Sequence, residues 1–582
     1  MGVIGRARMA HERPGRRHPL VEAAAVDLRA GRLDRREFLR FATLLGVSVA
    51  AARSIAGDPA RAQGVATAAA SENREPRFGG VLRCGMPIQP LVDPARFAWI
   101  EMSNQVRHQL EHLTITGPDN LTRPMLAAGW AASDDLKTWT FQLREGVRWG
   151  NGDAFSAEDV AFNMARWLDP ETRSSNLGLF ATMTEADPNA ADSEVVAGGW
   201  ARRAIEGALE VVDPLTVRLH LASPVLAMPE NFYNYPTAIL HRGYVGEPLW
   251  EALGTGPYRL VESAPGEFAR LTRVAEQAYW GAEIPHIGPG YVDEIQYRHF
   301  DPGDPRVKEA LNAGEIDLTY EIDLESPQAG PQGPEARLLT IDTAQAPCLR
   351  MRTDLAPFDD PRVRRAIQLC CDARAYPDAL FDGRGRVGEH HHVAPIHPEY
   401  FPLPRQRRRV EEARELLAAA GYDDGLDLVL DVGNTSGPWQ ERCCRLLSEQ
   451  AAEAGIRIEV NVISAAEYES TWRFRPFGLT QWVHRPLGTM ALSLGYRSGV
   501  PWNETRYANP EFDAALTRAE ALLDLAARRD AMEEVQRILQ RDAVMVQPCW
   551  RPVAILASQR LRGLAPHPSL YHQFNNVWFA DA

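Results

Sequence analysis

The sequence predicts an α/β fold that is built from more than one domain. The chain has 582 residues, which is more than one hydrophobic core usually holds together. Residues 426–430 have the apolar pattern of a strand, and a helical pattern over 439–454 follows and ends at Gly455. Residues 456–460 then alternate as a second strand. A strand, a helix and a strand of these lengths predict a parallel β-α-β unit.

The N-terminus has the layout of an export signal. Residues 34–40 contain two adjacent arginines followed by Phe-Leu and a base, and a modestly apolar run follows over 41–56. Small residues at 59–62 suit cleavage by a signal peptidase. This order is typical of a twin-arginine signal, which a receptor reads as an address. We predict a signal peptide over 1–62 and a flexible mature N-terminus over 63–75. The alternative is a basic helix on a cytosolic protein.

Alternating apolar residues predict strands in the first half of the chain. Residues 79–85 read as a first strand. Apolar and polar residues alternate over 139–143 and again over 217–221, as half-buried strands require. A capping box opens a helix over 156–167. Residues 182–199 are polar and irregular, which predicts a surface insertion.

Helical patterns dominate the second half. Residues 360–370 begin with Asp-Pro, which places an N-cap acid before a first-turn proline. Apolar residues at helical spacing over 410–420 predict another helix, which Gly421 ends. We expect two further amphipathic helices over 511–523 and 528–541.

The charge of the chain excludes some classes of partner. The net charge is −14, while residues 1–62 hold 12 Arg and 6 acidic residues, so the predicted mature part carries about −20. Such an acidic body argues against nucleic acid and against anionic membrane surfaces. The odd count of 7 cysteines and the lack of a Cys-x-x-Cys motif give little support to a thiol or zinc enzyme.

Several short motifs follow one another in a fixed order from Gly79 to the C-terminus. The most specific is Pro-Phe-Asp-Asp-Pro-Arg-Val-Arg-Arg-Ala-Ile over 357–367. The others lie at residues 126–130, 133–141, 143–149, 151–160, 254–258, 279–280, 314–317 and 507–513. By these motifs the chain resembles the extracytoplasmic solute-binding proteins of ABC importers, in the peptide- and nickel-binding family. Most of these motif residues are expected to be scaffold.

The resemblance implies the two-lobed periplasmic-binding-protein fold of cluster C, an α/β fold that encloses its ligand between the lobes. A hinge would join the lobes near residues 346–348 and 547–549. The implied parts are a discontinuous lobe I at 76–115, 206–345 and 550–582, its small subdomain at 116–205, and lobe II at 346–549.

The resemblance also implies a function without catalysis or cofactor. A soluble periplasmic monomer would capture a small peptide-like or other organic solute and deliver it to ABC permease subunits that a cytoplasmic ATPase drives. The twin-arginine translocation machinery would be a second partner, and nucleic acid would not be one. A ligand sensor or chaperone on the same fold is one alternative. An exported hydrolase is another, although the sequence lacks Gly-x-Ser-x-Gly, His-Glu-x-x-His and a phosphate loop.

One position departs from the pattern of the peptide-binding relatives. In these relatives a Trp followed three residues later by an Asp lies in the wall of lobe II, and the carboxylate pairs with the ammonium group of the ligand. Here Trp482 is present, His484 follows, and Arg485 stands at the Asp position. A guanidinium repels an ammonium and pairs with a carboxylate or phosphate. The ligand would therefore be anionic or lack a free amine. The alternative is an internal salt bridge of Arg485 in lobe II.

The same residue-by-residue comparison gives further candidates for ligand contact. In lobe I the matching segment contains no acid before Glu101. In lobe II the segments that match ligand-contacting segments of the relatives are a loop that faces the cleft and the residues downstream of Arg485. These candidates are Ala98, Trp99, Ile100, Trp439, Tyr496, Arg497 and Trp502.

The sequence offers one cluster with the composition of a metal site. His390, His391 and His392 are adjacent and His397 is near, within a Gly- and Pro-rich segment that predicts an exposed loop. We expect a solvated loop rather than a metal site. Cys348 and Cys549 lie on the two predicted hinge crossings, so a disulfide between them is an open alternative to two free thiols.

Overall fold

A computed structural model describes residues 18–31, 33–57, 75–188, 199–274, 279–324, 336–522 and 524–580. The predicted cleavage site at 59–62 and nearly all of the predicted N-terminal segment 63–75 lie outside these residues, as does most of the predicted insertion 182–199. Within the described residues, no helix has the length and apolar character that crossing a membrane requires.

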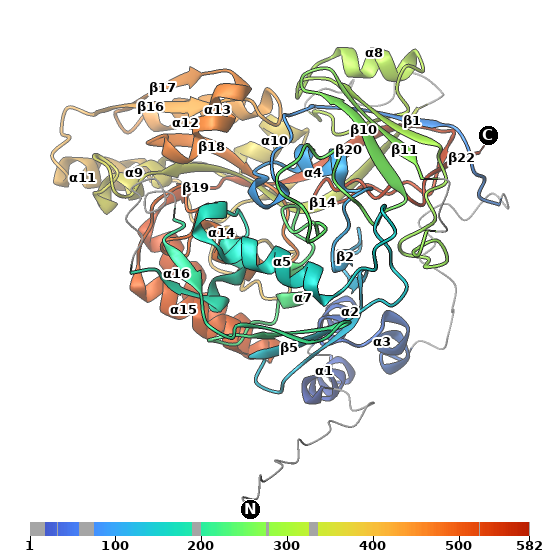
Figure 1. The fold of residues 1–582 in the computed structure, drawn as a ribbon. Helices are drawn as coiled ribbons and strands as arrows, with labels where there is room; N and C mark the ends of the chain where they lie inside the picture. The colour runs from blue at the N-terminus through green and yellow to red at the C-terminus, as the bar shows by residue number, and fades with distance from the viewer. Residues whose placement is uncertain are drawn as a thin grey trace, which may run out of the picture.

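The largest sheet runs through the upper part of the molecule in Figure 1. Its strands lie in the order β10-β11-β12-β1-β13-β20-β14-β18-β16-β17, with β15 paired to β20 and β19 paired to β14. Their bounds are β1 Val81–Met86, β10 Tyr258–Ala264, β11 Phe268–Arg273, β12 Glu294–His299, β13 Leu318–Thr319, β14 Ala336–Met351, β15 Arg386–Val387, β16 Leu426–Val432, β17 Ile456–Val462, β18 Phe477–Trp482, β19 Met545–Val546 and β20 Cys549–Ser558.

The strand β14 links the two halves of this sheet. Its first part pairs with β20 as far as Gln345, and from Ala346 onward it pairs with β18 and β19. The chain returns between β19 and β20 through residues 547–548. The first predicted crossing point therefore lies where β14 changes its pairing partner, and the second lies in the short link between β19 and β20, which both pair with β14.

The predicted β-α-β unit is confirmed. The strands β16 and β17 pair in parallel over their full length, and α12 (Trp439–Ala452) connects them. Three more helices pack into the hydrophobic core that β16, β17 and α12 share: α9 Pro361–Cys370, α10 Ala375–Phe381 and α11 Val410–Ala419. The predicted N-cap of α9 is present, because the Asp360 carboxylate accepts a hydrogen bond from the Arg362 amide at 2.8 Å.

A second, smaller sheet has the strand order β4-β5-β9-β8 and carries α5 (Ala157–Leu168). The predicted capping box of α5 is present between Ser156 and Asp159. The strands are β4 Ala127–Ala132, β5 Thr138–Leu143, β8 Leu209–Asp213 and β9 Thr216–His220. The sheet therefore extends past residue 205, where the sequence placed the end of the subdomain. The reason is that β5 finds its hydrogen-bonding partner in β9.

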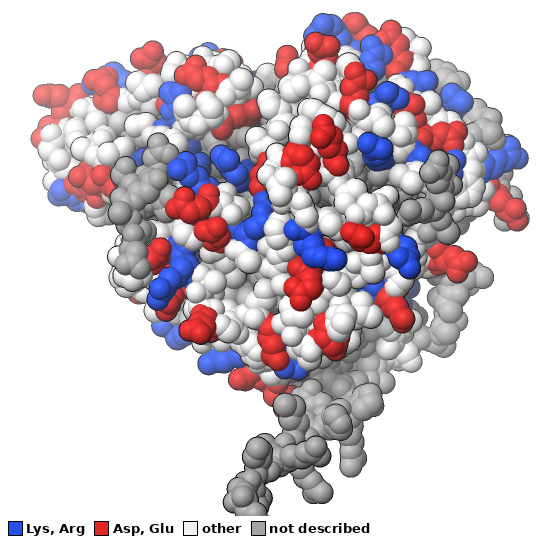
Figure 2. Space-filling view, in the orientation of Figure 1, with Lys and Arg blue, Asp and Glu red and all other residues white. Residues whose placement is uncertain are grey.

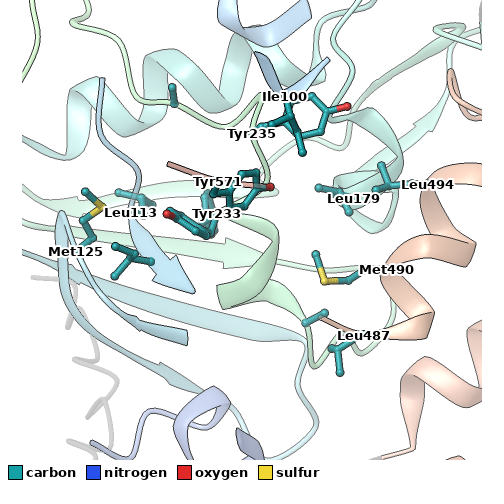
Figure 3. Close-up of a cluster of buried hydrophobic side chains, with 14 of the residues drawn as sticks. Ile100, Leu113, Met125, Leu179, Tyr233, Tyr235, Leu487, Met490, Leu494 and Tyr571 are labelled. Carbon is teal, nitrogen blue, oxygen red and sulfur yellow. The ribbon is translucent and has the colours of Figure 1, made fainter. Parts of the chain in front are cut away.

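Three helices from the predicted lobe II pack away from that lobe's own core. They are α14 Gly488–Gly495, α15 Pro510–Ala521 and α16 Leu525–Asp542. Their apolar faces join the core cluster of the small sheet, whereas β16, β17 and α12 have a separate core. Figure 3 shows Leu494 of α14 beside Leu179, which belongs to the short helix η3 (Leu177–Met183).

The remaining elements are short. The helices are α4 Ile100–Val106, α7 Met228–Asn231, α8 Arg306–Asn312 and α13 Ala465–Thr471, with 3-10 turns η1 Pro94–Arg96, η2 Pro170–Thr172 and η5 Trp472–Phe474. The strands are β2 Thr114–Thr116, β3 Thr122–Pro124, β6 Thr184–Ala186, β7 Arg202–Ala204, β21 Leu561–Arg562 and β22 Trp578–Phe579. On the face in Figure 2, acidic and basic side chains are interspersed.

The predicted signal segment folds onto the rest of the chain. It forms α1 (Pro19–Arg29), α2 (Arg35–Leu44) and α3 (Val49–Ile55), at the bottom of Figure 1. The side chain of Phe38 is fully buried in the core that contains Trp130, whose indole donates to the Leu44 carbonyl at 2.9 Å. Arg40 is buried with Glu230, with 3.7 Å between nitrogen and oxygen. Arg35 and Arg36 are exposed at the start of α2.

We expect Phe38→Ala to loosen α1–α3 from the body. Losing a buried Phe side chain costs about 3–5 kcal/mol, and α2 has few other large apolar side chains that are fully buried. Hydrogen exchange of the full chain should show faster exchange over residues 19–55. Val26→Ala removes a side chain that is 52% exposed and should leave exchange unchanged. Equal protection in both variants would contradict this packing.

Candidate ligand-binding cavity

A cavity of ≈ 50 Å³ lies beside the point where β14 changes partners, and Gln345 is part of its wall. Both predicted lobes contribute side chains, and most of these are buried. The wall consists of Ala98, Trp99, Ile100, Glu101, Tyr235, Tyr320, Glu321, Gln345, Thr435, Ser436, Trp472, Thr480, Gln481, Trp482, Val483, Arg485, Trp502 and Leu570.

Six of the candidates from the sequence line this cavity together. They come from the start of α4, from the end of β18 and from the loops that follow β18 and α14. They are Ala98, Trp99, Ile100, Trp482, Arg485 and Trp502. Residues about 400 positions apart in the chain therefore line the same cavity.

Arg485 is buried in the cavity wall without an acidic partner. Its side chain is 3% exposed, and the guanidinium carbon lies 5.5 Å from the Tyr235 ring centre and 5.9 Å from that of Trp502. One nitrogen donates to the His484 carbonyl at 3.3 Å, while Nε has no partner. Within the described residues, no carboxylate pairs with it. The internal salt bridge considered from the sequence is therefore not what the structure shows.

Aromatic rings make up much of the remaining wall. The rings of Trp482 and Trp502 meet edge to face at 6.1 Å, and those of Trp99 and Trp472 do so at 6.2 Å. The Trp482 indole nitrogen donates to the Glu504 carboxylate at 2.7 Å, which fixes the ring. Such rings pack on the apolar and planar parts of an organic ligand.

Glu504 is itself tied into the structure by a buried ion pair. Its carboxylate also accepts from Arg350 Nε at 2.7 Å and from the Thr480 hydroxyl at 2.6 Å. The side chains of Arg350 and Glu504 are 1% and 3% exposed. This network fixes the side chains of β18 that line the cavity.

Four of the sequence candidates do not line the cavity. Trp439 is 1% exposed and lies behind the wall, with the Arg551 guanidinium 5.0 Å from its ring centre. His484 accepts from the Ala344 amide at 3.0 Å through Nδ1. The Tyr496 hydroxyl donates to the Met545 sulfur at 2.9 Å. Arg497 pairs with Glu520 at 2.6 Å, beside a separate small pocket of ≈ 30 Å³.

The structure adds wall residues that the sequence did not single out. Glu321 lies in the wall and pairs with Arg551 at 2.5 Å, and Arg551 also contacts Gln345. Glu101 follows directly after the candidate Ile100, yet no residue pattern marks its position. Tyr235 is near Arg485 only because of the tertiary fold.

The prediction of an exposed histidine loop is wrong. His390, His391, His392 and His397 are all at most 3% exposed. His390 accepts from the Gln547 amide and His397 from the Ala394 amide, so each is used in packing. Desolvation lowers the pKa of His390, His392 and His397 to about 3. Among the described residues, no three His, Cys, Asp or Glu side chains gather as a metal ion would need.

The cysteines are unpaired in the structure. Cys348 and Cys549 are buried free thiols, as are the other five. Burial raises the pKa of Cys348 well above its usual value, which favours the protonated, unreactive form.

Comparisons with known proteins show the family of the chain. The family model of the bacterial extracellular solute-binding proteins, family 5 (middle part), matches residues 122–504. The glutathione-binding protein GsiB of Pectobacterium atrosepticum is 24% identical over 478 residues, which cover 78% of this chain and 85% of that protein. The heme-binding protein A of Haemophilus influenzae is 24% identical over 491 residues, or 78% of this chain and 83% of that protein.

The fold is shared with solved structures of binding proteins. The Haemophilus influenzae OppA complex with the peptide RPPGFSPFR superposes with a TM-score of 0.74 at 21% identity, covering 87% of this chain and 100% of that chain. The predicted α/β fold of periplasmic binding proteins is thereby confirmed. The relatives are binding proteins rather than enzymes. The chain belongs to the bacterial extracellular solute-binding proteins of family 5, which serve ABC importers.

Proposed function

We propose that this protein is the periplasmic substrate-binding component of an ABC importer and that it captures a small solute in the cavity around Arg485. The observation that carries this proposal is the state of Arg485, which is buried between aromatic rings without a carboxylate partner in the described residues. A buried guanidinium left in this state favours an anionic ligand group, which forms two parallel hydrogen bonds with it. The solute would be peptide-like or another organic molecule with a carboxylate or phosphate.

Ligand capture would close the two lobes around a hinge near residues 345–346, where β14 changes its pairing partner. The lobes follow the sequence proposal, with lobe I at 76–115, 206–345 and 550–582, its subdomain from 116 extended through β9, and lobe II at 346–549, of which α14–α16 pack on the small sheet. The cavity wall supports this motion, because Trp99 comes from one lobe and Trp482 from the other. A ligand that contacts both walls only in the closed state shifts the population toward closure.

The closed form would then dock on membrane permease subunits that a cytoplasmic ATPase drives. Export through the twin-arginine machinery, cleavage after residue 62 and a monomeric mature protein complete the proposal. The exposed position of Arg35 and Arg36 supports reading of the signal by a receptor. A sensor or chaperone role on the same fold is the second candidate, since the same ligand-dependent closure suits both roles.

Native mass spectrometry of the protein purified from its own periplasm tests the binding function. We expect a co-purifying anionic ligand that is lost in Arg485→Ala, with affinity lowered at least about thirtyfold, because a buried charge would lose its partner. Arg537→Ala is the matched control, since Arg537 is a half-exposed arginine on α16 far along the chain from the cavity wall. Turnover of the bound compound, or equal retention in both variants, would overturn the proposal.

A further inference from the structure

The helix α2 carries the arginine motif of the predicted export signal, and the fold divides that motif between solvent and body. Arg35 and Arg36 are exposed. Phe38 is fully buried in the core that contains Trp130, and Arg40 is buried as well. The two adjacent arginines are therefore accessible, while the Phe and the last base of the motif are covered by the folded chain.

The surface that receives α2 is assembled from distant parts of the chain. The Trp130 indole of β4 donates to the carbonyl of the last residue of α2 at 2.9 Å. Glu230 of α7 pairs with Arg40, and Arg529 of α16 pairs with the Glu of the motif. We call Trp130, Glu230 and Arg529 the helix dock. Because the small sheet, α7 and α16 each supply one of them, the helix dock exists only in the folded body.

A close backbone contact fits the signal segment to the helix dock. Gly46 follows α2 with a φ of +82°, and a Cβ atom at this position would collide with the carbonyl oxygen of Trp130. Gly57, after α3, has a similar φ of +78°, but among the described residues nothing lies within 4 Å of its Cβ position apart from its own neighbours. Both positions suit glycine by conformation. Only Gly46 is also constrained by the body.

Arg40 brings a charge into this contact. Its guanidinium nitrogen lies 3.7 Å from the Glu230 carboxylate, which is longer than a hydrogen bond. Burial lowers the pKa of Arg40 and raises that of Glu230 to about 7, so each charged form depends on its partner. A buried pair adds little net stability, but removing one partner leaves the other charge uncompensated. The contact is therefore selective for a base at position 40 and remains reversible.

We propose that the folded body binds its own twin-arginine helix on the helix dock and thereby masks that helix from the export receptor. This proposal rests on the export route proposed above. The receptor would read Phe38 and Arg40 together with the two exposed arginines, and the docked state covers the first two side chains. The helix dock and the receptor would then compete for one face of α2. The body would set the fraction of molecules whose signal is available.

Gly46→Ala in the full chain tests the docking while the motif and the body keep their residues. The added methyl group collides with β4, so the docked state is disfavoured. Hydrogen exchange over residues 35–44 should become at least about tenfold faster, because the helix is released more often. Gly57→Ala is the matched control, since it introduces Ala at a similar positive φ without the collision. It should leave exchange over 35–44 unchanged.

Binding of the same chains to membrane vesicles that contain the twin-arginine receptor gives the second readout, with receptor-free vesicles as the blank. An apparent affinity scales with the fraction of the competent state, so Gly46→Ala should bind about tenfold more tightly, in step with its faster exchange. Gly57→Ala should bind like the unmodified chain. Glu230→Gln should act like Gly46→Ala, because Arg40 loses its charged partner while the signal keeps its sequence.

The outcomes separate masking from the export route. Faster exchange without tighter binding, or weaker binding of both variants, would overturn the masking and leave the export route standing. Unchanged exchange in both Gly46→Ala and Glu230→Gln would overturn the helix dock itself. If none of the chains bound the receptor vesicles, the export route and the masking would fail together, while solute capture at Arg485 would be unaffected.

Discussion

Replacing Glu504 with Gln is expected to lower the free energy of unfolding by about 3–5 kcal/mol. The change leaves the buried Arg350 guanidinium without its carboxylate, and an uncompensated buried charge has a cost of this size. It also weakens the hydrogen bond that the Trp482 indole donates, so the cavity wall should loosen. Urea unfolding gives the free energy, and hydrogen exchange of β18 reports on the wall.

An exposed ion pair provides the matched control for Glu504. Asp427 and Arg457 pair at 2.6 Å on the neighbouring strands β16 and β17, with side chains 77% and 55% exposed. Asp427→Asn should change stability by less than about 1 kcal/mol. If the two variants were equally stable, Glu504 would not hold the wall as described.

Lowering the pH from 7.5 to 5.5 is expected to make local opening of residues 388–400 easier by about 4 kcal/mol. The pKa values of His390, His392 and His397 are about 3 in the folded protein, because burial disfavours the charged ring. The ordinary value is near 6.5, so the open segment binds protons that the closed one cannot. The contribution of the neutral rings to the stability of the closed segment is fully present above pH 6.5. It is lost as the pH falls, by about 1.3 kcal/mol per ring at pH 5.5.

Hydrogen exchange, corrected for the intrinsic rate at each pH, measures this local opening. The segment from β16 to β17 contains no histidine and should open with the same free energy at both pH values. Unchanged protection of 388–400 would contradict the burial of these rings.

Global unfolding should respond less to acid than the histidine segment does. Burial raises the pKa of Glu111 and Glu230 to about 7 in the folded protein, above the usual value near 4.3. Such carboxyl groups act with the opposite sign, because their contribution to stability is present at low pH and is lost as the pH rises toward 7. The two sets of groups therefore partly cancel when the whole chain unfolds.

The proposed binding site departs from the expected peptide-binding pattern at Arg485. By the family resemblance Arg485 stands at the position of the acid that would anchor a ligand amine, and Glu101 lies in the same cavity wall. The relatives include proteins named for glutathione and for heme, so the fold alone does not define a ligand. The charges and the hydrogen-bond partners of the wall residues are the basis for the proposed ligand.

Elements that depend on local signals can be predicted from the sequence. The β-α-β unit of 426–462 follows from hydrophobic period and length, and the starts of α5 and α9 follow from capping residues. The family resemblance also predicts that Trp99, Trp482 and Arg485 meet at one ligand site, because each matches a ligand-contacting segment of the relatives, and the three line one cavity. The hydrophobic period and the caps, by contrast, are properties that neighbours in the chain decide.

The tertiary structure alone decided what distant segments do to one another. The loop with His390 looks exposed by composition, yet it is buried because backbone amides such as that of Gln547 meet its rings. Tyr496 and Arg497 follow Arg485 closely in the chain but turn to other partners, since α14 packs on η3. Glu101 has no local signature. Burial shifts the pKa of His390 and of Glu101, and burial cannot be read from a residue's immediate neighbours.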